Sequence, residues 1–539
     1  MPDDTNRSPR LTPTTPQDSQ PQEEPLAGSG STGTGSTSTG STGTGGAGSR
    51  GERKRSGKRL AAGITAGVLL AGALGYGVAD AADVVPGFLT TEPAIEVDPL
   101  PQPVAAGQDV PAPASALTDS APIPTNAGSE LERILGDAQV KGFGVEVRDA
   151  LTDQVLFATD ENRARTPASV TKVLTASAAL LAIGGEQRLS TTTAFDPATS
   201  TVTLVGGGDA LLGAGESQPG AVNGHAGLAT LAEETAAALT ERQVTEVALA
   251  VDTSRYPGND FNPSWERADI AKGVITPIQP LMVDSGYVGD PSAAWRGRSE
   301  NPSADALAAF RSALETAGIT VTDQPAAASA ADTAGTTPNP TDTSAAATNT
   351  EEPATLAAVE SATISEIVEY ALVHSDNVVA EVLGNEVAIA EGMPGSLENG
   401  PKAVVAALED TVDLGQTQLY DTSGLDYGNR ISPHDLTTVL QASVVAKDSL
   451  SSLISYFPVG GLTGTLTDRF GDDPNAAGVV HAKTGTLSTV TSLAGGVLDA
   501  DGRYLVFSLQ IDGVDRAKIL EARKTVDDAV SALADCGCS

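Results

Sequence analysis

Cysteine is almost absent from this chain of 539 residues, which contains only Cys536 and Cys538, both at its C-terminal end. A Cys-x-Cys pair is too close in sequence for an ordinary disulfide. Two thiolates also leave a tetrahedral zinc site incomplete. The sequence therefore predicts no disulfide framework, and it leaves the role of this pair open.

Basic and aromatic residues are also scarce. Lysine and arginine number 32 against 69 aspartates and glutamates, for a formal net charge of −37, and aromatic residues make up 4%. This charge would repel a phosphate backbone, so we expect no nucleic-acid partner. No His-x-x-x-His pair and no promising start for a Ser-His-Asp triad occurs among the four histidines, His225, His374, His434 and His481. We expect neither a metal nor a cofactor.

One long uncharged run interrupts the N-terminal part of the chain. Residues 1–59 are rich in Ser, Thr, Gly and Pro, which predicts a disordered cytoplasmic tail, and they end in a basic cluster. Residues 60–79 carry no charge and are numerous enough to span a bilayer as an anchor. The basic flank predicts that the Pro/Ala-rich linker 80–128 and everything after it lie outside the cytoplasm. A cleaved signal peptide is the alternative, although its basic region would be unusually long.

Beyond the linker, the hydrophobic pattern mixes strands and helices, so the fold class is α/β (α+β). Alternating apolar residues predict strands, the first two as a hairpin, at 142–148, 154–159, 200–205, 247–252, 478–486, 492–498 and 504–510. Helical spacing predicts helices from about 167 and at 227–239, 304–317, 364–373, 378–390 and 517–533. The Ala/Thr/Asp/Pro-rich stretch 323–353 predicts a long loop.

Ser-Val-Thr-Lys at 169–172 is the first of three motifs that can carry chemistry. Thr166 can cap a helix whose first residue is Pro167, and this helix would place Ser169 and Lys172 on the same face. A serine hydroxyl is a weak nucleophile until a neighbouring base takes its proton. A lysine amine at this spacing can reach that hydroxyl, although Ser-x-x-Lys alone occurs by chance in most chains of this size.

The second motif is Ser-Asp-Asn at 375–377, between two predicted helices. On a tight connection, Ser375 and Asn377 can point to one side, because they are two residues apart. The serine can then pass on a proton while the asparagine holds a substrate amide.

The third motif is Lys-Thr-Gly-Thr at 483–486, on a predicted strand. The ammonium group of Lys483 and the hydroxyls of Thr484 and Thr486 can receive a carboxylate. Gly485 has no Cβ and would allow a ligand to approach the backbone closely.

Together, the three motifs occur in the order Ser-x-x-Lys, Ser-x-Asn, Lys-Thr-Gly. This set and order resemble the active-site serine penicillin-recognising enzymes, the β-lactamases and penicillin-binding proteins. Roughly 200 residues separate Lys172 from Ser375, many more than in class A β-lactamases. A large insertion at this point resembles the low-molecular-mass class C penicillin-binding proteins, which are D-Ala-D-Ala carboxypeptidases and endopeptidases.

The resemblance implies a fold as well. Residues 129–190 and 354–539 would form the two parts of a β-lactamase/transpeptidase-like domain, with an antiparallel sheet flanked by helices. One or two inserted domains would occupy 191–322, and the low-complexity loop 323–353 would follow them.

It also implies a mechanism. Ser169 would attack the carbonyl of the penultimate D-Ala of a peptidoglycan stem peptide, with Lys172 as its base. Ser375 would relay a proton to the leaving amine, and Asn377 would orient the peptide amide. Substrate would be bound through Lys483, Thr484, Gly485 and Thr486, with backbone N–H groups of Ser169 and Thr486 as the oxyanion hole. β-Lactams would inhibit by trapping the acyl-enzyme.

Two other functions stay open. A serine β-lactamase would share the acylation step but needs fast deacylation. A non-catalytic envelope module that binds peptidoglycan or a divisome partner would be marked by loss of the nucleophile or of a motif lysine, and Ser169, Lys172 and Lys483 are all present. The choice between carboxypeptidase and endopeptidase, the reading of the stem peptide's third side chain and the oligomeric state are not predicted.

Overall fold

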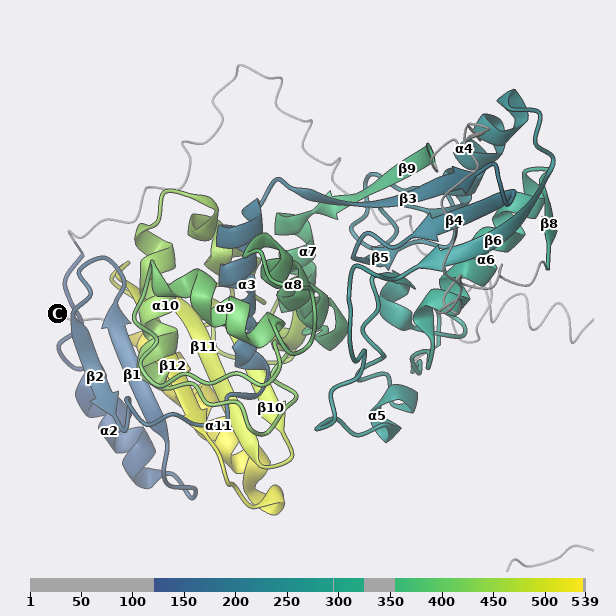
Figure 1. Ribbon diagram of the computed structural model, residues 1–539. Helices are drawn as coiled ribbons and strands as arrows, with labels where there is room; N and C mark the ends of the chain where they lie inside the picture. The colour runs from purple at the N-terminus through teal and green to yellow at the C-terminus, as the bar shows by residue number, and fades with distance from the viewer. Residues whose placement is uncertain (1–120, 294, 324–353, 537–539) are drawn as a thin grey trace, which may run out of the picture. The chain divides into compact units, whose positions relative to one another are not determined.

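The computed structural model describes residues 121–293, 295–323 and 354–536 (Figure 1). The predicted anchor at 60–79 and nearly all of the low-complexity loop lie outside these residues. Within the described part of the chain, no helix combines the length and the apolar character that a membrane crossing needs.

Helices and strands alternate along the described chain. The helices are α2 (Ala127–Asp137), α3 (Thr171–Ala179), α4 (Leu228–Glu241), α5 (Ala268–Ala271), α6 (Pro302–Thr316), α7 (Ile364–Val373), α8 (Asn377–Ala390), α9 (Gly400–Glu409), α10 (Pro433–Val445) and α11 (Ile519–Asp535). The strands are β1 (Gly144–Asp149), β2 (Val155–Thr159), β3 (Arg188–Asp196), β4 (Thr201–Val205), β5 (Asp209–Leu212), β6 (Glu246–Asp252), β7 (Leu281–Val283), β8 (Thr320–Thr322), β9 (Ala354–Thr363), β10 (Val480–Leu487), β11 (Val490–Leu498) and β12 (Tyr504–Ile511). Shorter helical turns are η1 (Ala168–Val170), η2 (Leu180–Gly184), η3 (Asp284–Gly286), η4 (Ser449–Tyr456), η5 (Gly464–Leu466) and η6 (Arg516–Lys518).

The first sheet has five strands in the order β10-β11-β12-β1-β2, and each neighbouring pair is antiparallel. Successive side chains of a strand point to opposite faces, so each strand serves two cores. On β12, Phe507 packs in the core that contains residues of α2 and α11, whereas Val506 packs in the core that contains residues of α3, α7, α8, α9 and α10. Figure 1 shows helices beside both faces of this sheet. An antiparallel sheet flanked by helices is what the family resemblance implied.

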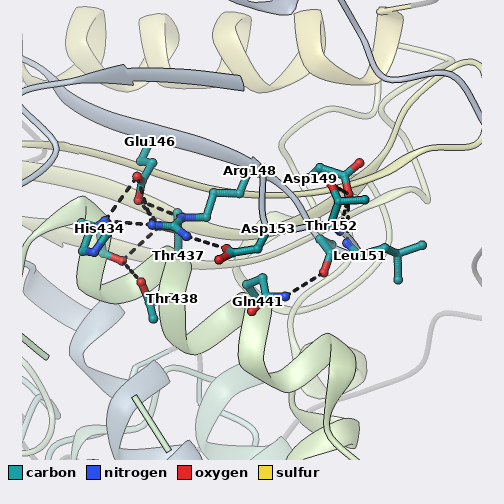
Figure 2. Close-up of polar contacts among 11 residues, drawn as sticks. Glu146, Arg148, Asp149, Leu151, Thr152, Asp153, His434, Thr437, Thr438 and Gln441 are labelled. Atoms are coloured by element: carbon teal, nitrogen blue, oxygen red, sulfur yellow. Dashed lines mark hydrogen bonds and ion pairs between the residues drawn. The ribbon is translucent and has the colours of Figure 1, made fainter. Parts of the chain in front are cut away.

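A polar network fastens β1 to α10 (Figure 2). Glu146 and Arg148 on β1 are both buried, and they pair through Oε2 and Nε at 3.2 Å. Arg148 also donates to the carboxylate of Asp153 at 2.5 Å and to Nδ1 of His434 at 2.9 Å. On α10, the hydroxyl of Thr437 donates to Glu146. Because these charges neutralise one another, β1 can pack against α10 without a buried unpaired ion.

A second sheet has the order β8-β6-β4-β3-β9. Its β4-β6 and β6-β8 pairs are parallel, as expected where helices such as α6 connect the strands, and its β3-β4 and β3-β9 pairs are antiparallel. Leucine and phenylalanine side chains from α4 and α6, including Leu231 and Phe310, fill the core against the sheet.

The strand β9 was not predicted. It pairs with β3 from Arg188 opposite Thr363 to Phe195 opposite Ala354. The second sheet therefore includes residues up to 363, although the insertion was expected to end at 322. The helices that cover the first sheet resume at α7. The sequence pattern missed this pairing because its partners stand more than 150 positions apart.

Candidate active site

Ser169 lies in the single turn η1, immediately before α3. The sequence predicted a helix from Pro167 with a Thr166 cap, and this detail is wrong. Ala168 has a left-handed φ of +52°, which an α-helix does not allow, so α3 begins only at Thr171. The Thr166 hydroxyl instead donates to the carbonyl of Tyr427 at 3.1 Å. The turn holds the serine at the amino end of α3.

Lys172 is the polar side chain that contacts this serine from within the protein core. Its side chain is buried, and its Nζ lies 3.2 Å from the Ser169 hydroxyl, 2.7 Å from Oδ1 of Asn377 and 2.7 Å from the carbonyl of Ser423. Three acceptors match the three protons of an ammonium group. Burial lowers the pKa of Lys172 to about 8, although nearby carboxylates, first of all Asp421, oppose this effect.

The second motif forms a sharp corner between α7 and α8. Ser375 has a left-handed φ of +54°, and Asp376 then caps α8 by accepting hydrogen bonds from the backbone N–H groups of Val378 and Val379 at 2.8 and 3.1 Å. A non-glycine residue in this region of φ is strained, and such strain is typical of functional sites. The corner points the two ends of the motif toward different lysines. Asn377, at one end, accepts the hydrogen bond from Lys172.

Ser375, at the other end of the motif, is hydrogen-bonded to Lys483. This lysine lies on β10, fully buried, and its Nζ donates to the Ser375 hydroxyl at 2.9 Å and to the carbonyl of Thr484 at 2.8 Å. Burial lowers the pKa of Lys483 well below its usual value, and the positive charges of Lys172 and Arg469 lower it further. The two motif lysines are therefore close enough to repel each other.

The remaining residues of the third motif differ in exposure. Thr486 is exposed and Thr484 is half-buried, with its hydroxyl 2.9 Å from that of Thr465. Gly485 is buried, and a Cβ placed on it would lie 2.6 Å from the carbonyl oxygen of Pro167. We expected Gly485 to let a ligand approach the backbone. In the structure, the chain segment Pro167–Ala168 next to Ser169 is what approaches this glycine. Gly485 brings the strand of Lys483 against the turn of Ser169.

Several buried charges around the motifs were not predicted. Glu381 on α8 accepts hydrogen bonds from the backbone of Thr422 and Ser423, and Asp421 accepts one from the indole of Trp265 at 3.0 Å. Burial raises the pKa of Glu381 to about 8, and Asp421 adds to this shift. The only sequence signal for Glu381 was its place in an apolar helix stretch, Val-Val-Ala-Glu-Val-Leu.

All five predicted catalytic residues therefore meet in one region. Ser169, Lys172 and Asn377 form one hydrogen-bonded group, while Ser375 and Lys483 form a second. A serine hydroxyl beside a buried lysine of lowered pKa is the arrangement of an activated nucleophile with its own base. This arrangement, on an antiparallel sheet with helices on both faces, is typical of the serine penicillin-recognising hydrolases.

Comparison with known proteins gives the family. The model of the D-Ala-D-Ala carboxypeptidase 3 (S13) family matches residues 127–294 and 289–533. The chain belongs to this family and is a serine hydrolase of the D-Ala-D-Ala carboxypeptidase class. The predicted membership in the low-molecular-mass class C penicillin-binding proteins is confirmed.

Two curated relatives match most of the chain. A carboxypeptidase of Mycobacterium tuberculosis is 31% identical over 437 residues, which are 78% of this chain and 87% of that protein. Carboxypeptidase DacB of Mycolicibacterium smegmatis is 32% identical over 451 residues, 82% of this chain and 90% of its own. Among solved structures, penicillin binding protein 4 of Haemophilus influenzae matches with a TM-score of 0.58 and 20% identity, over 75% of this chain and 99% of that protein. This last likeness establishes a shared fold.

Proposed function

We propose that this chain is a membrane-anchored, extracytoplasmic peptidase that cleaves next to the terminal D-Ala of peptidoglycan stem peptides, with Ser169 as its nucleophile. The observation that carries the proposal is the contact between Lys172 Nζ and the Ser169 hydroxyl at 3.2 Å. Burial lowers the pKa of Lys172 to about 8, so a useful fraction of this lysine is neutral near pH 7 and can accept a proton.

Acylation would proceed in two proton transfers. Ser169 Oγ attacks the carbonyl carbon of the penultimate D-Ala while its proton passes to Lys172 Nζ. The C–N bond then breaks, and the departing amine takes this proton from Lys172 by way of the Ser375 hydroxyl, which Lys483 contacts at 2.9 Å, so that Lys172 is neutral again. A water molecule next attacks the ester and gives a proton to Lys172, which passes it to Ser169 Oγ as the ester C–O bond breaks and the shortened peptide leaves.

Substrate recognition is assigned to the edge of β10. The exposed hydroxyl of Thr486 and the half-buried hydroxyl of Thr484 lie on the strand that also carries the Lys483 ammonium group. A charged donor together with hydroxyl donors suits a terminal carboxylate. The backbone N–H groups of Ser169 and Thr486 would bind the oxyanion, and Asn377 would orient the peptide amide. The substrate is thus held by its D-Ala end, which carboxypeptidase and endopeptidase reactions share.

β-Lactams are the expected inhibitors. One solved structure of penicillin binding protein 4 from Haemophilus influenzae, which matches this chain with a TM-score of 0.53, is a complex with a novel β-lactam. In this chain, a β-lactam would acylate Ser169 and, if deacylation is slow, stay there. Rapid turnover of a chromogenic β-lactam would instead favour the β-lactamase alternative.

The proposed location follows from the sequence. Peptidoglycan lies outside the cytoplasmic membrane, so the described residues, which all follow 60–79, would have to be exported. The uncharged run at 60–79 would serve as a single-pass anchor, with a cleaved signal peptide as the alternative. Detection of the intact N-terminus in a membrane fraction would distinguish the two.

Product analysis tests the activity. The full chain, purified in detergent, is incubated with a defined pentapeptide muropeptide and with a cross-linked dimer, and the products are weighed. We expect loss of terminal D-Ala, of the cross-link, or of both, and no product from Ser169→Ala. Ser177→Ala is the matched control, because Ser177 is a buried serine of α3 whose hydroxyl only donates to the Val173 carbonyl at 2.7 Å. Intact muropeptides after incubation with the folded wild-type chain would refute the proposal.

A further inference from the structure

The middle residue of the second motif is paired with an arginine from the inserted segment. Asp376 and Arg298 have side chains that are 4% and 2% exposed, and they form an ion pair between Oδ2 and Nη2 at 2.9 Å. Arg298 lies between β7 and α6, in the stretch of chain that separates the first motif from the second. The insertion thus reaches directly into the active-site corner.

Asp376 uses its carboxylate to fix the backbone that follows it and to bind a serine of the insertion. Its Oδ1 accepts the N–H groups of Val378 and Val379, and its two oxygens receive the Ser285 hydroxyl at 3.0 and 3.1 Å. The preceding residue, Ser375, holds the strained φ of +54°. A carboxylate in this position determines how the corner turns, and the corner determines where both motif side chains point.

Arg298 is itself held on every side. Its Nε donates to the carbonyl of Gly273 at 2.9 Å, its Nη1 donates to the Ser285 hydroxyl at 2.6 Å, and its guanidinium lies 3.9 Å from the ring centroid of Tyr287. The next carbonyl along the chain, that of Val274, accepts Nδ2 of Asn377 at 3.0 Å. Two consecutive carbonyls of the insertion therefore bind the arginine and the motif asparagine, so these contacts share one rigid support.

We infer that Arg298 is a positioning residue that acts through Asp376 to keep Ser375 against Lys483 and Asn377 against Lys172. The inference rests on the proposed function, because it concerns the rate at which the same site is acylated. Arg298 has no hydrogen bond to Ser169 or Lys172. Its positive charge helps to lower the pKa of Lys172, and its hydrogen bonds act on the site through the corner.

The shape of the guanidinium explains why this position carries arginine. Its planar fork places donors on Asp376, Ser285 and Gly273 at once, which the single ammonium group of a lysine cannot reproduce. Removing the arginine leaves a buried carboxylate without its counter-charge, and the corner must then shift toward water or take up a proton. Either change moves Ser375 or Asn377 away from its lysine.

The acylation rate with a fluorescent penicillin tests the inference on the full chain. We expect Arg298→Met to slow acylation by about 100-fold, the loss that accompanies a misplacement of about 1 Å, and Arg298→Lys to recover only part of it. In the double variant Arg298→Met with Asp376→Asn, the unpaired charge is gone, so acylation should recover by about tenfold relative to Arg298→Met.

The matched control is Arg503→Met. Arg503 pairs with Asp149, both fully buried, at the end of β1 away from the three motifs. This variant should be destabilised but, while folded, should be acylated at the wild-type rate. A folded Arg298→Met with the wild-type acylation rate, or a double variant without any recovery, would overturn the inference.

Two further results keep the inference decidable. If Arg298→Met does not fold, Ser285→Ala takes its place, because it removes one hydroxyl that bridges Arg298 and Asp376; acylation several-fold slower supports the inference, and an unchanged rate overturns it. A wild-type chain that penicillin does not acylate at all would instead refute the proposed function.

Discussion

Replacing Gly485 with alanine should separate the strand of Lys483 from the turn of Ser169. The new Cβ would lie 2.1 Å from the Ser492 hydroxyl and 2.6 Å from the Pro167 carbonyl oxygen, whereas real Cβ contacts are essentially never under 3.0 Å. The hydroxyl can rotate away, at the expense of its own 2.6 Å hydrogen bond to the Pro167 carbonyl. The backbone oxygen can yield only if the turn moves, by at least about 0.4 Å.

A movement of this size matters to the chemistry because the turn carries the nucleophile. Lys172 Nζ already lies 3.2 Å from the Ser169 hydroxyl, and a longer separation weakens proton transfer. Since a misplacement of about 1 Å can cost about 100-fold in rate, we expect Gly485→Ala to be acylated about tenfold more slowly. Overpacking should also reduce the free energy of unfolding by about 1–3 kcal/mol.

The assay is the rate of acylation by a fluorescent penicillin, with thermal unfolding measured on the same samples. The double variant Gly485→Ala with Ser492→Gly relieves the clash with the hydroxyl but not the clash with the carbonyl. It should therefore regain stability and stay slow. A Gly485→Ala variant with wild-type stability and acylation rate would show that the strand and the turn are not in the close contact described here.

Three other predictions concern the base, the carboxylate site and the fold. With a pKa of about 8, the neutral fraction of Lys172 rises from roughly one tenth at pH 7 to roughly one half at pH 8, so acylation should accelerate about fivefold over this step; a flat profile would contradict its role as base. Thr486→Val removes an exposed donor and should raise KM for a D-Ala-D-Ala peptide about tenfold while Tm stays unchanged, and an unaltered KM would exclude this contact. Thr363→Ala breaks the capping box with Glu366 at the start of α7 and should cost about 1 kcal/mol in urea unfolding with no effect on acylation; unchanged stability would refute it.

Much of the first sheet could be predicted from the sequence. The strands expected at 478–486, 492–498 and 504–510 correspond to β10, β11 and β12, because alternating apolar side chains between turn residues determine both the element and its buried face. The three motifs could also be ordered, and the second and third were placed on their elements, since their chemistry depends on short local spacings; Ser169 of the first lies in η1 before α3.

Long-range contacts could not be predicted. Nothing local indicates that Arg298 pairs with Asp376 or that β9 pairs with β3, because such partners are chosen by tertiary packing. Backbone strain could not be predicted from the sequence either. Ala168 has a left-handed φ, which alanine does not favour, and this φ delays the start of α3 to Thr171. In these three cases a distant segment or a strained backbone residue sets the conformation; β3, α9 and α10 were not predicted either.

The most direct test of the account is to locate the covalent adduct that penicillin leaves on the chain. The protein is treated with penicillin, digested and examined by mass spectrometry, with Ser169→Ala and Lys172→Ala as comparison variants. We predict one adduct, on Ser169, that is absent from Ser169→Ala and forms far more slowly on Lys172→Ala. An adduct on another residue would contradict the role of Ser169 as nucleophile. An adduct that forms equally fast on Lys172→Ala would contradict the activation of the Ser169 hydroxyl by the buried Lys172 amine.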